Sequence, residues 1–568
     1  MAQSRQDILL QQVVDLIGRQ RPAEAAHILD VVIGPAGQML APVWFLRGIV
    51  HLMQGDATSG ERALIRSLEL QPDFQEAAIE LVRLCNATGR FADGIGHSAA
   101  AAAVTRPAEA LLAERARAFQ AMGRHEDRVR ERERIVAIHS RKPAAYHNLA
   151  AALGDAGRVA EAEAAARQAL AAGGAAPETW LVLARALQGQ SRLDEADEAF
   201  AQALRLRPAY VDALRDRAQL AWMRSGDVES ALAVVGKSGT ETGAVAGDMA
   251  ALQAHICEVA GDAERGYALL RASGGCDDPR HQLMAARLAL HFDREAALNH
   301  ALRAVASTRG SAEAHRLLID CYLANGQAER ALPLIEAELV RTPMDQGLLA
   351  SRWTAWHMSG DGRAGELYDY DAFVRAGKID VPPGWNDRDS YLADLGAALR
   401  NLHRFRAHPL DQSLRWGSQT SADLLRSEEP AIRAFQTAID GPIRRYIAHL
   451  GQGDDVLRSR NRGNYAISGM WSVHLKSGGF HVSHVHPMGW LSSACYIELP
   501  AALDADTKEG WLKFGEPGIP MVSPIAAARH VRPEPGLLVL FPSYMWHGTE
   551  AFAARGSRLS IAFDIVPA

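Results

Sequence analysis

The stretch "PETWLVLARALQGQSRLDEADEAFAQALRLRP", residues 177–208, decides the fold of most of the chain. It holds two runs of helix-forming residues, the first with an early tryptophan and the second rich in alanine, and a Gly-Gln-Ser segment separates them. Proline stands at each end, where a missing backbone N–H does no harm. Small alanine side chains let neighbouring helices approach closely. The stretch therefore predicts a helical hairpin.

The same form recurs along the chain at a nearly constant interval. Glycine ends the first helix of a hairpin at four positions that are each 34 residues apart: Gly55, Gly89, Gly123 and Gly157. Ser191 keeps the interval, and the spacing becomes less regular after Gly261. Glycine suits such a turn because it adopts the left-handed conformation with the least strain. A period of this length predicts an array of about ten stacked hairpins.

A 34-residue period with Trp or Tyr early, Ala and Phe later and Pro last resembles the tetratricopeptide repeat. The resemblance covers roughly residues 10–365 and implies an α-solenoid with a concave groove. Such a groove implies a peptide or protein partner. A rigid spacer or a dimerisation platform is the alternative, and it leaves homo-oligomerisation open.

Composition narrows the classes of function. The chain has 568 residues, which is too long for a protein with a single hydrophobic core. Its content of 48% hydrophobic and 23% charged residues is ordinary for a globular protein. A net charge of −6 shows no excess of basic residues, which a protein that binds nucleic acid or an anionic membrane normally has. No uninterrupted apolar run is long enough to span a membrane, and the first twenty residues lack the apolar core of a signal peptide.

The five cysteines indicate the compartment. They are dispersed, odd in number and form no CxxC motif, which is typical of reduced, buried thiols. We therefore expect a cytoplasmic protein with no nucleic-acid partner and no membrane partner.

The repeat pattern stops near residue 365. The following "GELYDYDAFVRAGKIDVPPGWND" carries aromatics and a Pro-Pro-Gly segment, and two amphipathic helices come next. Short β-type runs separated by Gly and Pro turns begin near residue 463, and they favour a barrel or jelly-roll sandwich. The fold class is thus α+β and multidomain. We expect three parts: a repeat superhelix at 1–365, a linker with packing helices at 366–450, and a β domain at 451–568.

"HVSHVHPMGW", residues 481–490, gathers three histidines within six positions. His484 and His486 are two residues apart, so on a strand both side chains point to the same face. His481 has the opposite parity, and we expect it to face away as a structural residue.

Two further residues extend this pattern. His547 lies 61 residues beyond His486 and follows a strand that reads as buried. Arg558 comes eleven residues later, on what should be the adjacent strand. Together with the histidine pair, these residues predict a metal site with a cation beside it.

The order His-x-His, distal His and then Arg resembles the double-stranded β-helix of iron(II)- and 2-oxoglutarate-dependent oxygenases. Residues 463–566 also resemble one such family through His-x-His-Pro, Phe-Pro-Ser followed by His, and Arg-x-Ser-Ile-Ala-Phe. The resemblance implies an Fe(II) site, 2-oxoglutarate as co-substrate, O2 and a hydroxylation. The repeat array implies that the substrate is a peptide or a protein.

The resemblance also implies the roles of individual residues. The metal ligands, and thus the catalytic residues, would be His484, His486 and His547. The co-substrate would be bound by Arg558, Ser560 and Tyr496, with the guanidinium forming a bidentate pair with the distal carboxylate.

Several alternatives stay open at this point. His486 stands where such sites commonly have Asp or Glu, and zinc or copper would also accept three imidazoles. Glu498 could supply a carboxylate, although an exposed acid on a strand is usually solvated. The domain could instead be a degenerate module on a non-catalytic scaffold, or a hydroxylase of a small molecule.

Overall fold

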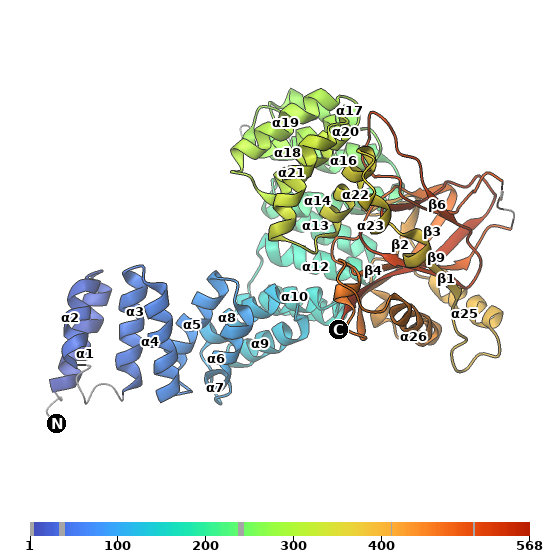
Figure 1. Ribbon diagram of the computed structural model, residues 1–568. Helices are drawn as coiled ribbons and strands as arrows, with labels where there is room; N and C mark the ends of the chain where they lie inside the picture. Colours follow the sequence, from blue (N-terminus) through green and yellow to red (C-terminus); the bar gives the residue numbers. More distant parts are fainter. Residues whose placement is uncertain (1–4, 33–39, 237–243, 411, 502, 504–505) are drawn as a thin grey trace. The chain divides into compact units, whose positions relative to one another are not determined.

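The computed structural model describes residues 5–32, 40–236, 244–410, 412–501, 503 and 506–568 (Figure 1). The chain divides into two units, Met1–Ala203 and Leu204–Ala568. None of the described helices has the length and apolar character that crossing a membrane requires.

The first unit consists of helical hairpins. Its helices are α1 (Arg5–Gly18), α2 (Pro22–Val32), α3 (Ala41–Met53), α4 (Ala57–Leu70), α5 (Gln75–Ala87), α6 (Phe91–His97), α7 (Ala99–Ala102), α8 (Glu109–Ala121), α9 (His125–Ile138), α10 (Pro143–Asp155), α11 (Val159–Ala171), α12 (Pro177–Gly189) and α13 (Leu193–Leu206). The predicted turns are present, since Gly157 has φ +70° and Ser191 reaches φ +60° at the equivalent position. Fully buried alanines such as Ala162 and Ala166 allow close helix packing.

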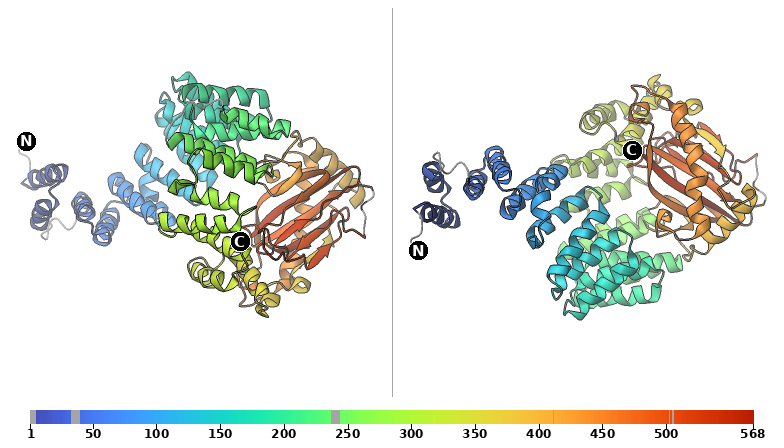
Figure 2. Two further views of the ribbon diagram at one scale, coloured as in Figure 1. Left: turned by 90° about the horizontal axis from the view of Figure 1, so that it is seen from above. Right: turned by 90° about the horizontal axis from the view of Figure 1, so that it is seen from below.

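The second unit continues the hairpins. Its next helices are α14 (Val211–Ser225), α15 (Val228–Gly236), α16 (Ala244–Val259), α17 (Ala263–Ala272), α18 (Gln282–Ala289), α19 (Arg294–Ser307), α20 (Ala312–Ala324), α21 (Ala328–Arg341), α22 (Gln346–Met358), α23 (Arg363–Leu367) and α24 (Tyr370–Phe373). Two helices, α25 (Arg388–Arg400) and α26 (Pro430–Leu450), then accompany the strands. Figure 2 shows α26 crossing one face of the larger sheet.

The strands of the second unit form two antiparallel sheets. They are β1 (Arg375–Lys378), β2 (Leu414–Gln419), β3 (Tyr465–His481), β4 (Leu491–Glu498), β5 (Leu512–Phe514), β6 (Arg529–Val531), β7 (Leu537–Pro542), β8 (His547–Thr549) and β9 (Ser557–Pro567). The larger sheet has the order β1-β7-β4-β9-β3-β2 and the smaller one β6-β5-β8. The α+β layout is confirmed. The double-stranded β-helix and the three domain bounds stay predictions.

Two strands lie in the region where the sequence indicated only helices. β1 and β2 form the two edges of the six-stranded sheet. β1 has the sequence Arg-Ala-Gly-Lys and is largely exposed, so it lacks an alternating apolar pattern. β2 carries an irregularity at Trp416, whose φ is +57°, and this breaks the period of two.

Repeat helices and sheets share one core in the second unit. Buried apolar side chains run without interruption from α18 to β9. Direct hydrogen bonds support this packing: Trp222 Nε1 donates to the His408 carbonyl at 2.8 Å, and Val522 N to the Ala324 carbonyl at 2.8 Å. The helices of this unit are therefore part of the framework that holds the strands.

Candidate metal centre

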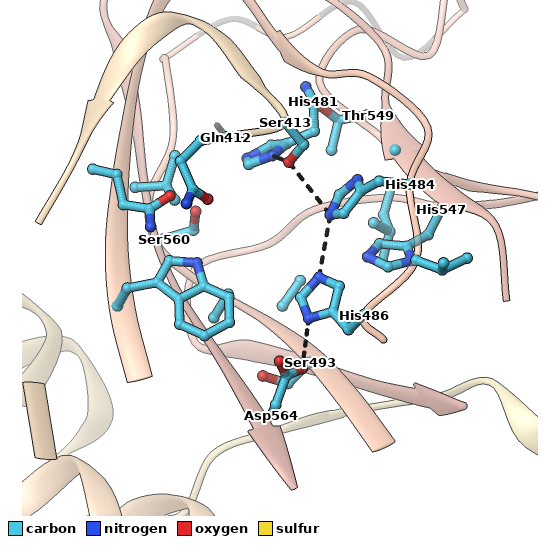
Figure 3. A pocket seen from close by; sticks show the side chains of 18 of the residues that line it. Gln412, Ser413, His481, His484, His486, Ser493, His547, Thr549, Ser560 and Asp564 are labelled. Atoms are coloured by element: carbon cyan, nitrogen blue, oxygen red, sulfur yellow. Dashed lines mark hydrogen bonds and ion pairs between the residues drawn. The ribbon is translucent and has the colours of Figure 1, made fainter. Parts of the chain in front are cut away.

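Backbone pairing brings the predicted histidines together. His484 and His547 form an antiparallel bridge, with N–H to carbonyl distances of 2.9 and 3.1 Å. The His486 N–H donates to the Ser543 carbonyl at 3.1 Å. One nitrogen atom from each of the three rings lies within 4.8 Å of the others (Figure 3). The residues that the sequence singled out thus converge on a single point.

Each ring is oriented by the hydrogen bond of its Nδ1 atom. The acceptors are the Val482 carbonyl for His484 at 2.8 Å, the Met545 carbonyl for His547 at 2.9 Å, and Asp564 Oδ1 for His486 at 2.6 Å. These oxygens only accept, so Nδ1 carries the proton and Nε2 keeps a free lone pair.

The spacing of the free nitrogens fits a metal ion. The Nε2 atoms of His484 and His486 are 3.1 Å apart. Two imidazole nitrogens at right angles around a cation, each at ~2.1 Å from it, would lie about 3.0 Å apart. The donor set of three imidazoles therefore suits a divalent transition metal with open positions.

Burial keeps the His484 and His547 imidazoles neutral. Desolvation, together with the neighbouring His486, lowers the pKa of His484 to about 3. Desolvation also holds the pKa of His547 well below its ordinary value. Because the neutral ring is the form that binds metal, these two rings are in the metal-binding form at physiological pH.

A carboxylate supports the site from behind one ligand. Besides the Nδ1–H of His486, Asp564 Oδ1 accepts the Ser492 hydroxyl at 2.8 Å. Asp564 was not among the predicted site residues, although the sequence carries a signal for it, because it follows Arg558 and Ser560 at even spacing on one strand. Glu498 forms an ion pair with Arg400 at the protein surface, as expected for a solvated acid.

The expectation that His481 faces away is wrong. Its ring lines the same pocket, and its centroid lies 6.0 Å from that of His484. Its Nδ1 is 3.0 Å from Ser413 Oγ, which is 3.3 Å from His484 Nε2. The reason is that β3 ends at His481 and the chain bends before His484 pairs with His547, so strand parity does not extend across the bend.

Arg558 lies buried in the same pocket, and no carboxylate among the described residues pairs with it. It is 2% exposed, its Nη1 donates to the Gly510 carbonyl at 2.9 Å, and its Nε has no hydrogen-bond partner in the described part of the chain. The Tyr496 hydroxyl, below the guanidinium, also has no described partner. Burial lowers the pKa of Arg558 and raises that of Tyr496 to about 12. Two buried donors without acceptors fit a bound carboxylate.

One cavity connects these groups. It has a volume of ≈ 520 Å³, and the three histidines, Arg558, Ser560 and Tyr496 all line it. Trp471 also lines it and stacks against His486 with ring centroids 5.8 Å apart. The site residues that the sequence predicted therefore face a common space, although their roles stay predictions.

The turn before His547 is fastened to the repeat helices. The Tyr368 hydroxyl accepts the Trp546 N–H at 2.8 Å and donates to the Tyr544 carbonyl at 2.6 Å. Trp546 Nε1 donates to Thr354 Oγ1 of α22 at 3.0 Å, and the Tyr368 ring stacks on Trp353 with centroids 4.2 Å apart. The last repeat thus fixes the segment that presents one imidazole.

Comparison with known families agrees with this architecture. The family described as "Putative 2OG-Fe(II) oxygenase" matches residues 469–564, and the tetratricopeptide repeat family matches 181–235 and 277–345. The chain therefore combines tetratricopeptide repeats with a C-terminal domain of this oxygenase family, as the sequence predicted. No curated protein matches the chain.

Solved structures similar to the chain are repeat proteins. A tetratricopeptide repeat protein from Parabacteroides merdae is 16% identical, with 44% of this chain and 98% of that chain covered and a TM-score of 0.34. Yeast Tom70 is 12% identical, with 64% and 91% covered and a TM-score of 0.34.

Proposed function

We propose that the C-terminal domain is a 2-oxoglutarate- and Fe(II)-dependent hydroxylase. A C–H bond of the substrate and 2-oxoglutarate each give two electrons to O2. One oxygen atom enters the new hydroxyl group and the other enters succinate, while CO2 leaves. The observation that carries the proposal is the convergence of three free imidazole nitrogens beside a buried, uncompensated guanidinium.

Each residue of the site would have a separate role. His484, His486 and His547 would hold the iron, which when bound supplies the activation of O2. Arg558 would pair with the distal carboxylate of 2-oxoglutarate, and Ser560 and Tyr496 would donate hydroxyl hydrogen bonds to the co-substrate. Asp564 keeps the Nδ1 proton on His486, so that Nε2 faces the metal. Trp471 excludes water on one side of the pocket.

The repeats would recruit the substrate. Tetratricopeptide repeats generally mediate contacts between proteins, and here the helices of the second unit share a core with the pocket-bearing sheets. A peptide or protein bound along the array would therefore reach a site built on the same framework. We place this hydroxylase in the cytoplasm, with bounds at 1–365 for the array, 366–450 for the packing helices and 451–568 for the catalytic domain.

A turnover assay tests the proposal. Full-length protein loaded with Fe(II) should convert 2-oxoglutarate to succinate, slowly even without substrate, and Arg558→Met should abolish this while iron uptake persists. A protein that takes up no metal and makes no succinate would be a repeat scaffold instead. Uptake of zinc or copper in preference to iron, again without succinate, would contradict the assignment of the metal.

A further inference from the structure

Several residues that line the pocket bind neither the iron nor the co-substrate in the proposed function. Gln412, Gln419, Trp471 and Met488 are four of them. We propose that these four form the amide subsite, which receives a neutral amide group of the substrate, and that Gln412 and Gln419 bind it. The inference rests on the proposed function and names the chemical class of its substrate.

Strand register places Gln419 away from the co-substrate end. Gln419 pairs with Val473 of β3, and Val473 pairs with Ser560 of β9. The three residues thus form one row across neighbouring strands, and two strand spacings put Gln419 about 10 Å from Ser560. Trp471 lies two residues before Val473, and thus on the same face of β3, and its ring stacks against that of His486.

Gln412 approaches from the opposite end of β2. It precedes Ser413, whose hydroxyl lies between His481 and His484, and whose carbonyl accepts the Val482 N–H at 3.0 Å. Figure 3 shows Gln412 across the pocket from His547. A group held by this side chain would therefore face the metal ligands.

The two glutamine side chains are free to bind a ligand. Neither side-chain amide makes a hydrogen bond within the described ranges of the chain, and both line the pocket. A carboxamide offers one acceptor oxygen and two donor hydrogens, which is the complement of another amide. Few polar groups in an otherwise apolar pocket are what fixes the orientation of a ligand.

Charge in the pocket excludes an ionised substrate group. Arg558 and Asp564 are the charged residues of its described lining. Arg558 is assigned to the co-substrate, and Asp564 is bound to His486 Nδ1. A carboxylate or ammonium placed beside Trp471 would therefore find no charged partner in this part of the pocket, whereas the two glutamine side chains offer a neutral amide matched hydrogen bonds. The remaining wall is apolar, with Val482, Val485 and Met488.

Two sources of the amide are possible, and matched peptides separate them. Four capped pentaalanine-based peptides, differing only in a central Asn, Ala, Asp or Lys, would be titrated at millimolar concentration into the full-length protein with 2-oxoglutarate. Saturation-transfer NMR on the zinc-substituted protein would report binding independently of turnover. Tighter binding of the Asn peptide identifies a side-chain carboxamide. Equal binding of the Asn and Ala peptides, above the charged ones, identifies the main-chain amide.

Substitutions in the subsite locate the contact. Gln412→Glu and Gln419→Glu should each weaken binding of the neutral peptides about tenfold. Each substitution removes an amide donor, and with it a hydrogen bond to the peptide, and adds a negative charge. Gln436→Glu, an exposed position on α26, adds the same charge and should leave binding unchanged.

The outcomes separate this inference from the proposed function. Preference for the Asp or Lys peptide, equal effects of all three substitutions, or binding of none of the peptides would overturn the amide subsite. Absence of succinate with the expected peptide preference would overturn the hydroxylase and leave the subsite standing.

Discussion

The helical hairpins of the two units have the same pattern but different surroundings. In the first unit the hairpins pack on their sequence neighbours through small residues such as Ala162 and Ala166. In the second unit, the equivalent helices also bond to the strand-bearing region, as Trp222, Thr354 and Tyr368 do. The difference teaches that the later repeats belong to the scaffold of the site, whereas the described packing of the earlier ones is between neighbouring hairpins.

Removal of one imidazole from each unit should reveal the largest difference between the two units. His547→Ala deletes a predicted ligand, and since changes to groups behind a ligand already cost 10–100-fold, metal affinity should fall by about 100-fold or more. His147→Ala in the first unit, which removes the contact to Thr179 Oγ1 at 3.3 Å, should leave metal affinity unchanged. Competition with a chelating indicator measures both. Equal metal affinities for the two variants would refute the assignment.

Buried arginines offer the second contrast. Arg115 in the first unit bonds to Glu131 at 2.8 Å, whereas Arg558 has no carboxylate partner among the described residues. Arg558→Met should therefore weaken 2-oxoglutarate binding at least about 30-fold without destabilising the unit. Arg115→Met should cost the first unit about 2 kcal/mol and leave co-substrate binding intact. Calorimetric titration measures 2-oxoglutarate binding, and hydrogen exchange measures the stability of each unit. Weaker 2-oxoglutarate binding in Arg115→Met, with normal binding in Arg558→Met, would contradict the roles assigned to the two arginines.

Acid should weaken the second unit through His403. Its two ring nitrogens lie 2.9 and 3.0 Å from the Ser418 and Ser472 hydroxyls, and burial with the nearby His474 lowers its pKa to about 3. The unfolded ring titrates near 6.5, so its unfolded state binds the proton first. The stabilisation is thus complete above about pH 6.5 and is lost as pH falls toward 3, by about 2 kcal/mol at pH 5.

Hydrogen exchange at pH 7 and pH 5 would measure this loss for the second unit separately. His403→Gln should reduce the loss between pH 7 and pH 5 by about 2 kcal/mol, because the replacement does not titrate, while other buried rings such as His484 still do. A slope that is the same in His403→Gln as in the unchanged protein would assign the effect to other groups.

The smallest expected effect is that of removing the hydrogen bonds that hold the turn before His547. Tyr368→Phe removes the hydroxyl that joins Trp546 N to the Tyr544 carbonyl, and Tyr446→Phe removes a matched bond to the Phe373 carbonyl at 2.6 Å. Each should cost about 1 kcal/mol of stability. Metal affinity should fall about fivefold in Tyr368→Phe alone. An equal metal affinity in the two variants would show that the last repeat does not position the site.

Short-range patterns predicted much of this molecule. The glycine interval located the hairpin turns, including Ser191 at φ +60°. His484, His486, His547 and Arg558 line one pocket, as their order in the chain predicted. The predicted strand under the His-x-His pair is absent, because β3 ends at His481, His484 forms only an isolated bridge and His486 lies outside the strands.

What the sequence could not predict depends on bends and distant partners. His481 faces the pocket because the chain bends after β3. The alternation of side chains along a strand cannot predict such a bend. Ser413 and Tyr368 act from segments 71 and 178 residues away from the groups that they contact. Such partners follow from tertiary packing, and no spacing rule connects them.

Diffraction from crystals of the full-length protein grown anaerobically with Fe(II) and 2-oxoglutarate would test the central claim most directly. Anomalous signal at the iron edge should place one ion on the Nε2 atoms of His484, His486 and His547, with a carboxylate of the co-substrate on Arg558. Iron bound elsewhere, or a 2-oxoglutarate that leaves Arg558 without a partner, would contradict the account.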